Sequence, residues 1–427
     1  MSRRIDLTPL RIPAYRRFFA GWTLYLASAW VYSTALTWTF LQSSGTAAAV
    51  GYLPVALVLP VPVALVLGGL ITDRRGPKAA LVFSQSAMCL TVLAIGLLSA
   101  AGQLTFVPVL VTGFLIGIFG GFGGVPAQAL MVRLVDRRLM ASVYALSLVS
   151  VGLGRLVGGP LGGQIVQLVG ATPALMVGAA GIGASALLFA TLPHVEPLET
   201  AAARVGFRDL GDTIRWVRWM PAAIAIIALE ATLSGLVYPY QQVMPVIARD
   251  VLGGGAPALG LLVAAGGAGV VLGGTFLAFA GRRLGQGRLL AAAIITAASG
   301  IAGLAISHSL LLSMVLAALV AGGSNAASMT ASLLLQTMSP PRMRGRVLAL
   351  DSVVSSLANP ISLLGVGLLV ERLGPTPVLL AMAGLGILAL AAVRLAHRPI
   401  LTLDVDSRGH LVPTMLGSAE PQPGETT

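Results

Sequence analysis

The sequence predicts an all-α polytopic membrane protein with twelve transmembrane helices arranged as two pseudo-symmetric six-helix halves. Of its 427 residues, 56% are hydrophobic and only 10% are charged, whereas a soluble protein carries roughly a quarter charged residues. Several apolar stretches reach the ~20 residues that cross the ~30 Å hydrocarbon core of a bilayer as a helix. The 52 glycines have no three-residue period, which excludes collagen and fits helices that pack closely in lipid.

Hydropathy and helix-breaking residues divide the chain into segments. A polar segment at 1–17 lacks the apolar core of a signal peptide, so the first span is expected to remain as an anchor. We expect an N-terminal half at 18–193, a linker at 194–219, a C-terminal half at 220–395 and a tail at 396–427. The twelve spans are predicted at 18–42, 49–71, 79–100, 105–132, 140–168, 172–193, 220–247, 256–280, 289–307, 309–336, 345–370 and 374–395.

Basic residues are concentrated in alternate loops. The opposite loops are nearly neutral, with Arg249 and Arg372 as exceptions. Because basic loops stay on the cytoplasmic side, both termini are predicted to be cytoplasmic and the chain to lie in the cell membrane. The net charge of +12 therefore reflects topology rather than nucleic-acid binding, since no soluble domain could present a basic face. The basic clusters lie within 3–17, 74–78, 133–138, 204–218, 282–288, 342–346 and 394–408.

Three smaller features complete the organisation. In the linker, Phe207, Leu210, Ile214 and Val217 follow helical spacing among arginines, which predicts an amphipathic helix on the membrane surface. The polar tail has no periodicity, so we expect no regular structure there. The single Cys89 lies within an apolar span and excludes an intrachain disulfide.

The two halves also share short sequences at one offset of 204 residues. "VYAL" at 143–146 overlays "VLAL" at 347–350, and "GATPAL" at 170–175 overlays "GPTPVL" at 374–379. Both pairs fall at the fifth or sixth span of their half. Duplicated halves are typical of secondary transporters, whose substrate sites lie between the repeats.

A charged loop between the second and third spans carries a spaced motif. Its residues follow the pattern G-x-x-x-D-R-x-G-x-K-x-x-L, at Gly69, Asp73, Arg74, Gly76, Lys78 and Leu81. The pattern resembles the signature loop of the major facilitator superfamily, with Pro77 where that family usually has a basic residue. The resemblance implies a gate that holds the two halves together in one conformation and releases them in the other.

Asp73 is the only acid of this loop, and a carboxylate can bind helix N-termini and guanidinium groups. Its candidate partners are Arg133 after the fourth span and Arg346 at the start of the eleventh. The alternative is a loop that only sets topology, which would explain the arginines but not Asp73. The equivalent second-half loop, "GRRLGQGR" at 281–288, lacks the Asp.

Further stretches narrow the resemblance. "LRIPAYRRFFAGWT", "MVRLVDRRLMASVYALSLVSVGLGRLVGGPLGG" and "PRMRGRVLAL" are similar to the efflux branch that contains the enterobactin exporter and macrolide efflux proteins, over about 10–395. The fourth span lacks the arginine that antiporters of the superfamily carry. The fifth span resembles their glycine-proline signature, although small-residue helix packing is the alternative explanation. Its residues are Gly158, Gly159, Pro160, Gly162 and Gly163.

Three ionisable residues are expected at bilayer depth, where a charge costs several kcal/mol and usually serves a function. Glu230 lies about ten residues into the seventh span, near the midplane at ~1.5 Å per residue. Arg155 is similarly deep in the fifth span, although it could be structural. Asp351 follows Arg346 by five residues and could instead pair near the interface. Glu230 is the candidate proton-coupling carboxylate, with Asp351 next.

Polar and aromatic residues form stripes at helical spacing along three of the predicted spans. A proline, Pro239, should kink the seventh span. Each stripe alone could reflect hydrogen bonds between helices, but together they indicate a cavity that is polar and aromatic. The stripes comprise Ser234, Tyr238 and Gln241 after Glu230; Asn325, Ser328, Ser332 and Gln336 in the tenth span; and Trp30, Ser33, Thr37 and Trp38 in the first.

These observations favour a proton-coupled secondary exporter of hydrophobic or amphipathic small molecules. An importer of sugars or organic anions, which Arg155 would favour, and a non-transporting sensor or scaffold are the alternatives. An enzyme is not expected, because the four histidines are scattered and no G-K-S/T phosphate cradle is present. We expect no cofactor, metal or nucleic acid, and the partners to be substrate, protons and the lipid bilayer, with the monomer functional.

The topology can be tested by cysteine labelling from outside the cell, in a chain whose Cys89 is replaced by Ala. A membrane-impermeant reagent should modify a cysteine placed at Ser44 and should leave one placed at Thr426 unmodified. The reverse labelling pattern would show that the basic loops are not cytoplasmic.

Overall fold

A computed structural model describes residues 7–44, 49–194, 207–237, 239–340, 343–396, 403–405 and 411–413. Within them, eleven helices are long and apolar enough to cross a membrane. The predicted first span is a further helix of 32 residues, whose tryptophans, tyrosines, hydroxyl side chains and two arginines lower its hydropathy. The all-α fold class is confirmed. After a short 3-10 helix at Thr8–Arg11, the first half contains α1 (Pro13–Ser44), α2 (Ala49–Val58), α3 (Val61–Arg75), α4 (Pro77–Ala100), α5 (Phe106–Arg133), α6 (Met140–Val169) and α7 (Ala171–Ala190).

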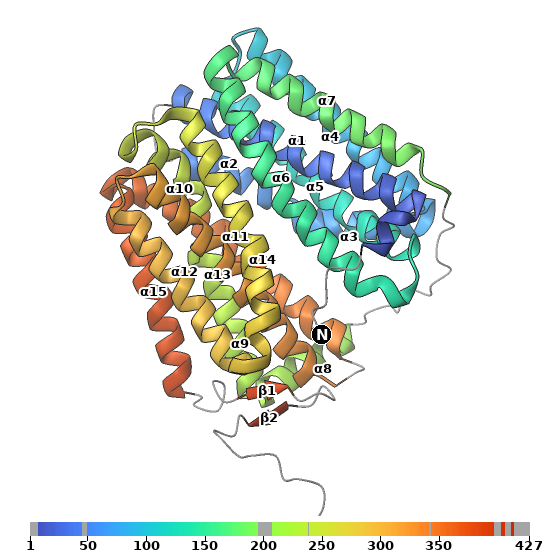
Figure 1. Ribbon diagram of the computed structural model, residues 1–427, viewed down its shortest axis with the longest axis vertical. Helices are drawn as coiled ribbons and strands as arrows, with labels where there is room; N and C mark the ends of the chain where they lie inside the picture. Colours follow the sequence, from blue (N-terminus) through green and yellow to red (C-terminus); the bar gives the residue numbers. More distant parts are fainter. Residues whose placement is uncertain are drawn as a thin grey trace, which may run out of the picture.

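The second half begins after the linker helix α8 (Phe207–Trp219). Figure 1 shows its yellow-green to red helices as a bundle beside the blue-to-green bundle of the first half. The halves meet mainly through α6 against α11 and α2 against α14. The elements of the second half are α9 (Pro221–Thr232), η3 (Leu233–Val237), α10 (Tyr240–Val246), η4 (Ile247–Val251), α11 (Gly255–Leu284), α12 (Gln286–Ile306), α13 (Leu310–Met338), α14 (Arg344–Leu373) and α15 (Pro375–Ala396).

Glycines bring the backbones of α6 and α11 into direct contact. A Cβ atom added at Gly159 would lie 2.8 Å from the carbonyl oxygen of Gly260, and Gly163 faces the backbone of Ala256 in the same way. The contact continues towards the middle of the helices, where a Cβ added at Gly267 would lie 2.9 Å from the Gly152 oxygen. We call this the α6–α11 seam. Small residues such as glycine and alanine let two helices approach this closely.

The second contact between the halves lies near the neutral loops. Gly51 of α2 packs against the backbone of Leu363 and Gly367 in α14. Two residues of α1, Trp38 and Leu41, belong to the apolar core of the second half rather than to that of their own half. The halves are therefore packed together at the end of the molecule that lies opposite the basic loops.

The second span is predicted as one continuous segment, but in the structure it consists of two helices. It is broken into α2 and α3 between Val58 and Val61. Pro60 and Pro62 lack the backbone N–H groups that would continue the helix, and their rings clash with the carbonyl groups four residues earlier. One span, Gly51–Arg75, still crosses the apolar layer.

The predicted seventh span is interrupted more strongly than the expected kink. It passes from α9 through the π-helical turn η3 into α10 and a second π-helical turn, η4. Pro239 lies two residues after the end of η3. Its ring is incompatible with a normal α-helical bond to the carbonyl of Gly235. A π-helical turn inserts one residue per turn, so residues before and after η3 do not share one regular α-helical face.

Positive-φ glycines occupy matching turns in the two halves. Gly170 (φ 92°) precedes α7 and Gly374 (φ 82°) precedes α15. Likewise Gly76 (φ 81°) joins α3 to α4, and Gly285 (φ 73°) joins α11 to α12. Residues with a side chain rarely adopt such backbone angles. The turns agree with the duplication that the sequence repeat indicates.

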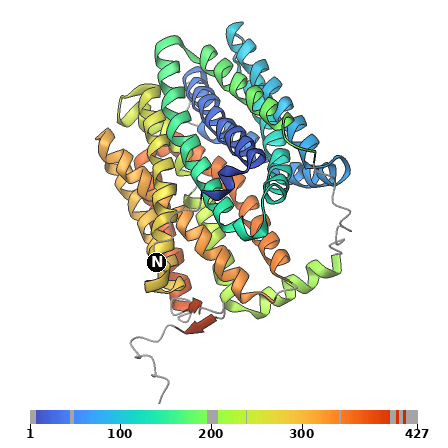
Figure 2. The ribbon, with the colours of Figure 1, turned by 45° about the vertical axis from the view of Figure 1, so that its right-hand side comes forward.

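The described parts of the linker and the tail, at 207–219, 403–405 and 411–413, lie at the basic end of the second half. Figure 2 shows α8 crosswise to the bundle, which confirms the expected helix. Its buried face is Thr213 and Val217, whereas Ile214 is exposed; the side chains of Phe207 and Leu210 lie outside the described residues. In the tail, where we expected no regular structure, β1 (Leu403–Val405) and β2 (Leu411–Pro413) form an antiparallel pair. Packing of β1 against α12 supplies the contacts that the sequence pattern lacks.

The α6–α11 seam can be tested with two matched substitutions. Gly159→Ala should destabilise the protein by about 1–3 kcal/mol, because the added methyl group overpacks the contact with Gly260 and Val263. Gly124→Ala in α5 meets nothing within 4 Å and should stabilise the protein by about 0.5–1 kcal/mol through helix propensity. The midpoints of thermal unfolding in one detergent measure both effects. If both substitutions raised the midpoint of thermal unfolding equally, the seam would be loosely packed.

Candidate functional site

The charged loop lies open at the basic end. Asp73 is exposed and makes no hydrogen bond or ion pair with any residue that the structure describes. It is therefore not brought to Arg133 or Arg346, both of which are half-buried. Gly69 has no atom within 4 Å of an added Cβ, so close packing does not require glycine there. The loop is in the arrangement that the superfamily resemblance associates with released halves.

Other residues of the loop hold it to its own half. Lys78 Nζ donates a hydrogen bond to the Leu192 carbonyl oxygen at 2.5 Å, just beyond the end of α7. Arg17 donates to the neighbouring Thr191 carbonyl oxygen at 2.7 Å. Cations at a helix C-terminus interact favourably with its unpaired carbonyl groups. Leu81 is fully buried below. Lys78 thus fixes the start of α4, whereas Arg74 remains exposed.

A cluster of polar residues lies inside the second half, where α9, α13 and α14 meet. Glu230 on α9 is only 6% exposed, and Oε1 accepts a hydrogen bond from Ser328 Oγ on α13. Asp351 on α14 is also 6% exposed and lies close enough to Glu230 for their charges to interact. Asp351 does not pair with Arg346 in this structure. Two of the predicted intramembrane acids are thus neighbours, and we call them the carboxylate pair.

Several oxygens around the carboxylate pair are buried without a hydrogen-bond partner among the described residues. Glu230 Oε2 and Asp351 Oδ1 are two of them. A buried polar atom without a hydrogen-bond partner costs about 1–3 kcal/mol. A group of such atoms is therefore a candidate site for a proton, an ion or a polar ligand group. On the two neighbouring helices the same holds for Asn325 Oδ1, Ser355 Oγ and Asn359 Oδ1.

Sequence reasoning missed Ser355 and Asn359. With Asp351 they follow a spacing of four along α14 and therefore lie on one helix face. The spacing of four was present in the sequence, but the adjacent Ser356 made it uncertain which of the two serines shared a helix face with Asp351. Only the contacts of α14 with α9 and α13 distinguish this face from the lipid-exposed one.

The other predicted residues of the seventh and tenth spans are less closely connected. Ser234 in η3 is buried, Gln241 in α10 is half-buried, and Tyr238 lies outside the described residues. Ser332 is half-buried on α13. Because η3 interrupts the helix, the expected continuous face from Glu230 to Gln241 is not formed.

Arg155 and Trp30 form a second polar contact, in the first half. The Arg155 guanidinium carbon lies 4.8 Å from the centroid of the Trp30 ring, which joins α6 to α1 by a cation–π interaction. Nearby, Thr23 donates a hydrogen bond to Ser150 between the same helices at 2.9 Å. Trp38, in contrast, is 5% exposed within the apolar core. Trp30 is thus placed against a charged group, whereas Trp38 belongs to the apolar cluster of the second half.

The glycine motif of the fifth span lies on two faces of α6. Gly158 packs against Ala27 and Trp30 of α1, and Gly162 packs against Val31. Gly159 and Gly163 instead face α11 across the seam, while Pro160 is half-buried within α6. These contacts favour the packing explanation for all four glycines.

The family of transmembrane secretion effectors, within the major facilitator superfamily, has a sequence model that matches residues 5–420 of this chain. The chain belongs to this family. It is therefore a membrane transporter of the major facilitator type, and the superfamily that the charged loop resembles is confirmed.

Individual proteins agree with this assignment. The multidrug efflux pump Tap of Mycolicibacterium fortuitum is 24% identical over 384 residues, which cover 88% of this chain and 93% of Tap. Among solved structures, the POT family transporter PepTSo superposes with a TM-score of 0.71 at 14% identity, covering 92% of this chain and 98% of that one. The nucleoside transporter NupG gives 0.67 at 15% identity, covering 89% and 98%. At such identities the solved structures establish the fold alone.

The charged loop can be tested with two identical substitutions at the same end. Asp73→Asn should lower transport by about tenfold or more. In the conformation in which the loop holds the two halves together, a charge-assisted hydrogen bond of the Asp73 carboxylate would contribute about 1.5–3 kcal/mol, and an amide cannot replace it. Asp136→Asn, at an exposed acid outside the loop, is the control. Dye efflux normalised to the amount of protein in the membrane measures both. Unchanged efflux by the Asp73 variant would reduce the loop to a topology signal.

Proposed function

We propose that this transporter is a secondary active exporter of hydrophobic or amphipathic small molecules, driven by protons that enter in exchange. The observation that supports coupling of transport to protons is the buried carboxylate pair in the second half. The name of the similar Tap protein, a multidrug efflux pump, supports the direction and the substrate class. By the distribution of basic loops, we infer that the basic end faces the cytoplasm.

The electrostatics of the carboxylate pair support a coupling role. Two negative charges held close together in a low-dielectric interior repel each other. A proton, or the cationic group of a substrate, relieves that repulsion when it binds. If the two compete for Glu230 and Asp351, arrival of substrate from one side displaces a proton that entered from the other, which is the exchange that an antiporter requires.

The helix contacts support alternating access. The halves are packed together along the seam and through Gly51, while Asp73 at the basic end is exposed and unengaged. A rocking movement about the α6–α11 backbone contact would close the basic end and open the other, as expected for two repeats that move around a central site. Trp30 and the guanidinium of Arg155 would present an aromatic and a polar surface to the substrate.

An importer of organic anions is the second candidate, because Arg155 is a fixed cation at bilayer depth. Proteoliposomes distinguish the two. The exporter predicts that a proton gradient drives an amphipathic dye towards the acidic side, whereas the importer predicts that an organic anion moves together with protons. If neither flux is observed, both the exporter of amphipathic dyes and the importer of organic anions are ruled out for the substrates tested.

Glu230→Gln should abolish dye efflux driven by a proton gradient, because glutamine keeps the hydrogen bond to Ser328 but cannot carry a proton. Exchange of dye down its own gradient should persist at least in part. Glu371→Gln, the same substitution at an exposed site at the far end of α14, should leave both activities intact. Both fluxes are measured in proteoliposomes of defined orientation.

Continued uphill efflux by the Glu230 variant would rule out Glu230 as the coupling group. The same assay on Asp351→Asn then decides whether the second carboxylate takes that role. Loss of exchange as well as uphill efflux in both variants would assign the pair to substrate binding instead.

A further inference from the structure

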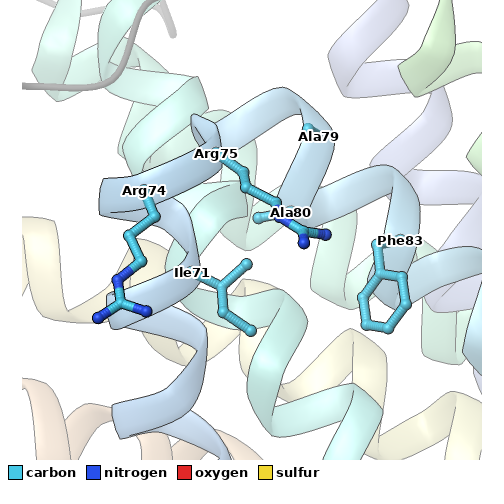
Figure 3. Close-up of a pocket in the computed structure, with 6 residues that line it drawn as sticks. All are labelled: Ile71, Arg74, Arg75, Ala79, Ala80 and Phe83. Carbon is cyan, nitrogen blue, oxygen red and sulfur yellow. The ribbon is translucent and has the colours of Figure 1, made fainter.

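A cleft opens between α3 and α4, beside the charged loop and away from the carboxylate pair. Its volume is about 370 Å³, within the range of small-molecule sites. Figure 3 shows Arg75 reaching into it between Ile71 and Phe83, with Arg74 on the other side of Ile71. The remaining walls are Ala79 and Ala80 of α4.

The local sequence creates this cleft. Ile71, Arg74 and Arg75 are spaced three and four residues apart, so they lie on one face of α3. Gly76 and Pro77 turn the chain directly into α4. The first turn of α4 then presents two alanines, whose short side chains leave the space unfilled. Phe83 is held below by edge-to-face contacts with Phe119 and Phe122.

The charge of the cleft is positive. Arg74 and Arg75 are exposed, and neither makes a hydrogen bond or ion pair within the described part of the chain. No acid lines the cleft. Lys78 is turned away to the Leu192 carbonyl. Guanidinium groups with unused donors are suited to bind phosphate, which they can contact through two parallel hydrogen bonds.

The cleft lies at the end of a membrane span, with apolar surface next to it. Arg75 is the last residue of the span Gly51–Arg75. On α4, Phe83, Leu90 and Leu97 are 54%, 65% and 57% exposed at intervals of seven residues. α4 packs against α3, α5 and α7 of its own half, and the exposure of these three side chains shows that the stripe faces outwards. An apolar track thus runs from the cleft along the outer surface.

We propose that the cleft binds an anionic phospholipid. The phosphate lies on Arg75, with Arg74 as a second cation at the rim, and one acyl chain follows Phe83, Leu90 and Leu97. The volume admits a head group but not a whole lipid, so the chains must lie on the outer surface. Free phosphate would use the arginines but not the apolar track. The proposal does not depend on the direction or coupling of transport.

The test uses the full chain in phosphatidylcholine vesicles that contain a trace of photoactivatable phosphatidylglycerol. Crosslinking to the peptide that spans residues 67–97 is measured by mass spectrometry. We expect about tenfold less crosslinking from a photoactivatable phosphatidylcholine, and a loss of similar size with Arg75→Gln. Arg74→Gln should cause a smaller loss. Arg138→Gln, an exposed arginine at the same end outside the cleft, should change nothing.

Two further arms identify the ligand. Ala79→Trp fills the cleft while it keeps both arginines, so it should also abolish the crosslink. Inorganic phosphate should displace the lipid no better than chloride at equal ionic strength. The proposal is overturned if Ala79→Trp crosslinks normally, if Arg138→Gln loses as much as Arg75→Gln, or if inorganic phosphate displaces the lipid specifically.

Discussion

The backbone contact between α6 and α11 is the constraint on which the arrangement of the two halves depends. Where Gly159 meets Gly260 and Gly163 meets Ala256, the helices leave no room for a methyl group. In lipid, where apolar side chains gain little by leaving the solvent, such close approach supplies much of the packing energy. Side chains of the facing helix, such as Val263 against Gly159 and Val271 against Gly152, also pack onto these glycines, so the contact fixes how α6 and α11 are rotated against each other.

The same packing determines where polar groups can be buried. Tight contacts of α6 with both α1 and α11 position Arg155 over Trp30, while α9, α13 and α14 enclose the carboxylate pair in the other half. The two polar sites thus belong to different halves, and any movement about the seam changes their relative position. Substrate that contacts both would respond to that movement, which links binding to conformational change.

The sequence predicted the helices well and the contacts between them unevenly. Long uncharged segments defined the spans, and only the proline-containing second and seventh were not regular helices. Glu230 and Asp351 were singled out because charge is rare at bilayer depth, but nothing in the pattern placed them side by side. Ser355 and Asn359 were missed for a different reason: a serine or asparagine becomes informative only when its surroundings bury it without a hydrogen-bond partner.

By itself, the sequence determined that this protein is a duplicated bundle of membrane helices with its basic loops on one side, because hydrophobicity and charge act locally along the chain. Tertiary structure decided which faces of those helices meet. It joined Ser328 to Glu230 across 98 positions of sequence, left Asp73 exposed and unpaired with its expected partners, and opened a cleft next to Arg75. These outcomes depend on the rotation and tilt of each helix, which are set by packing against its neighbours.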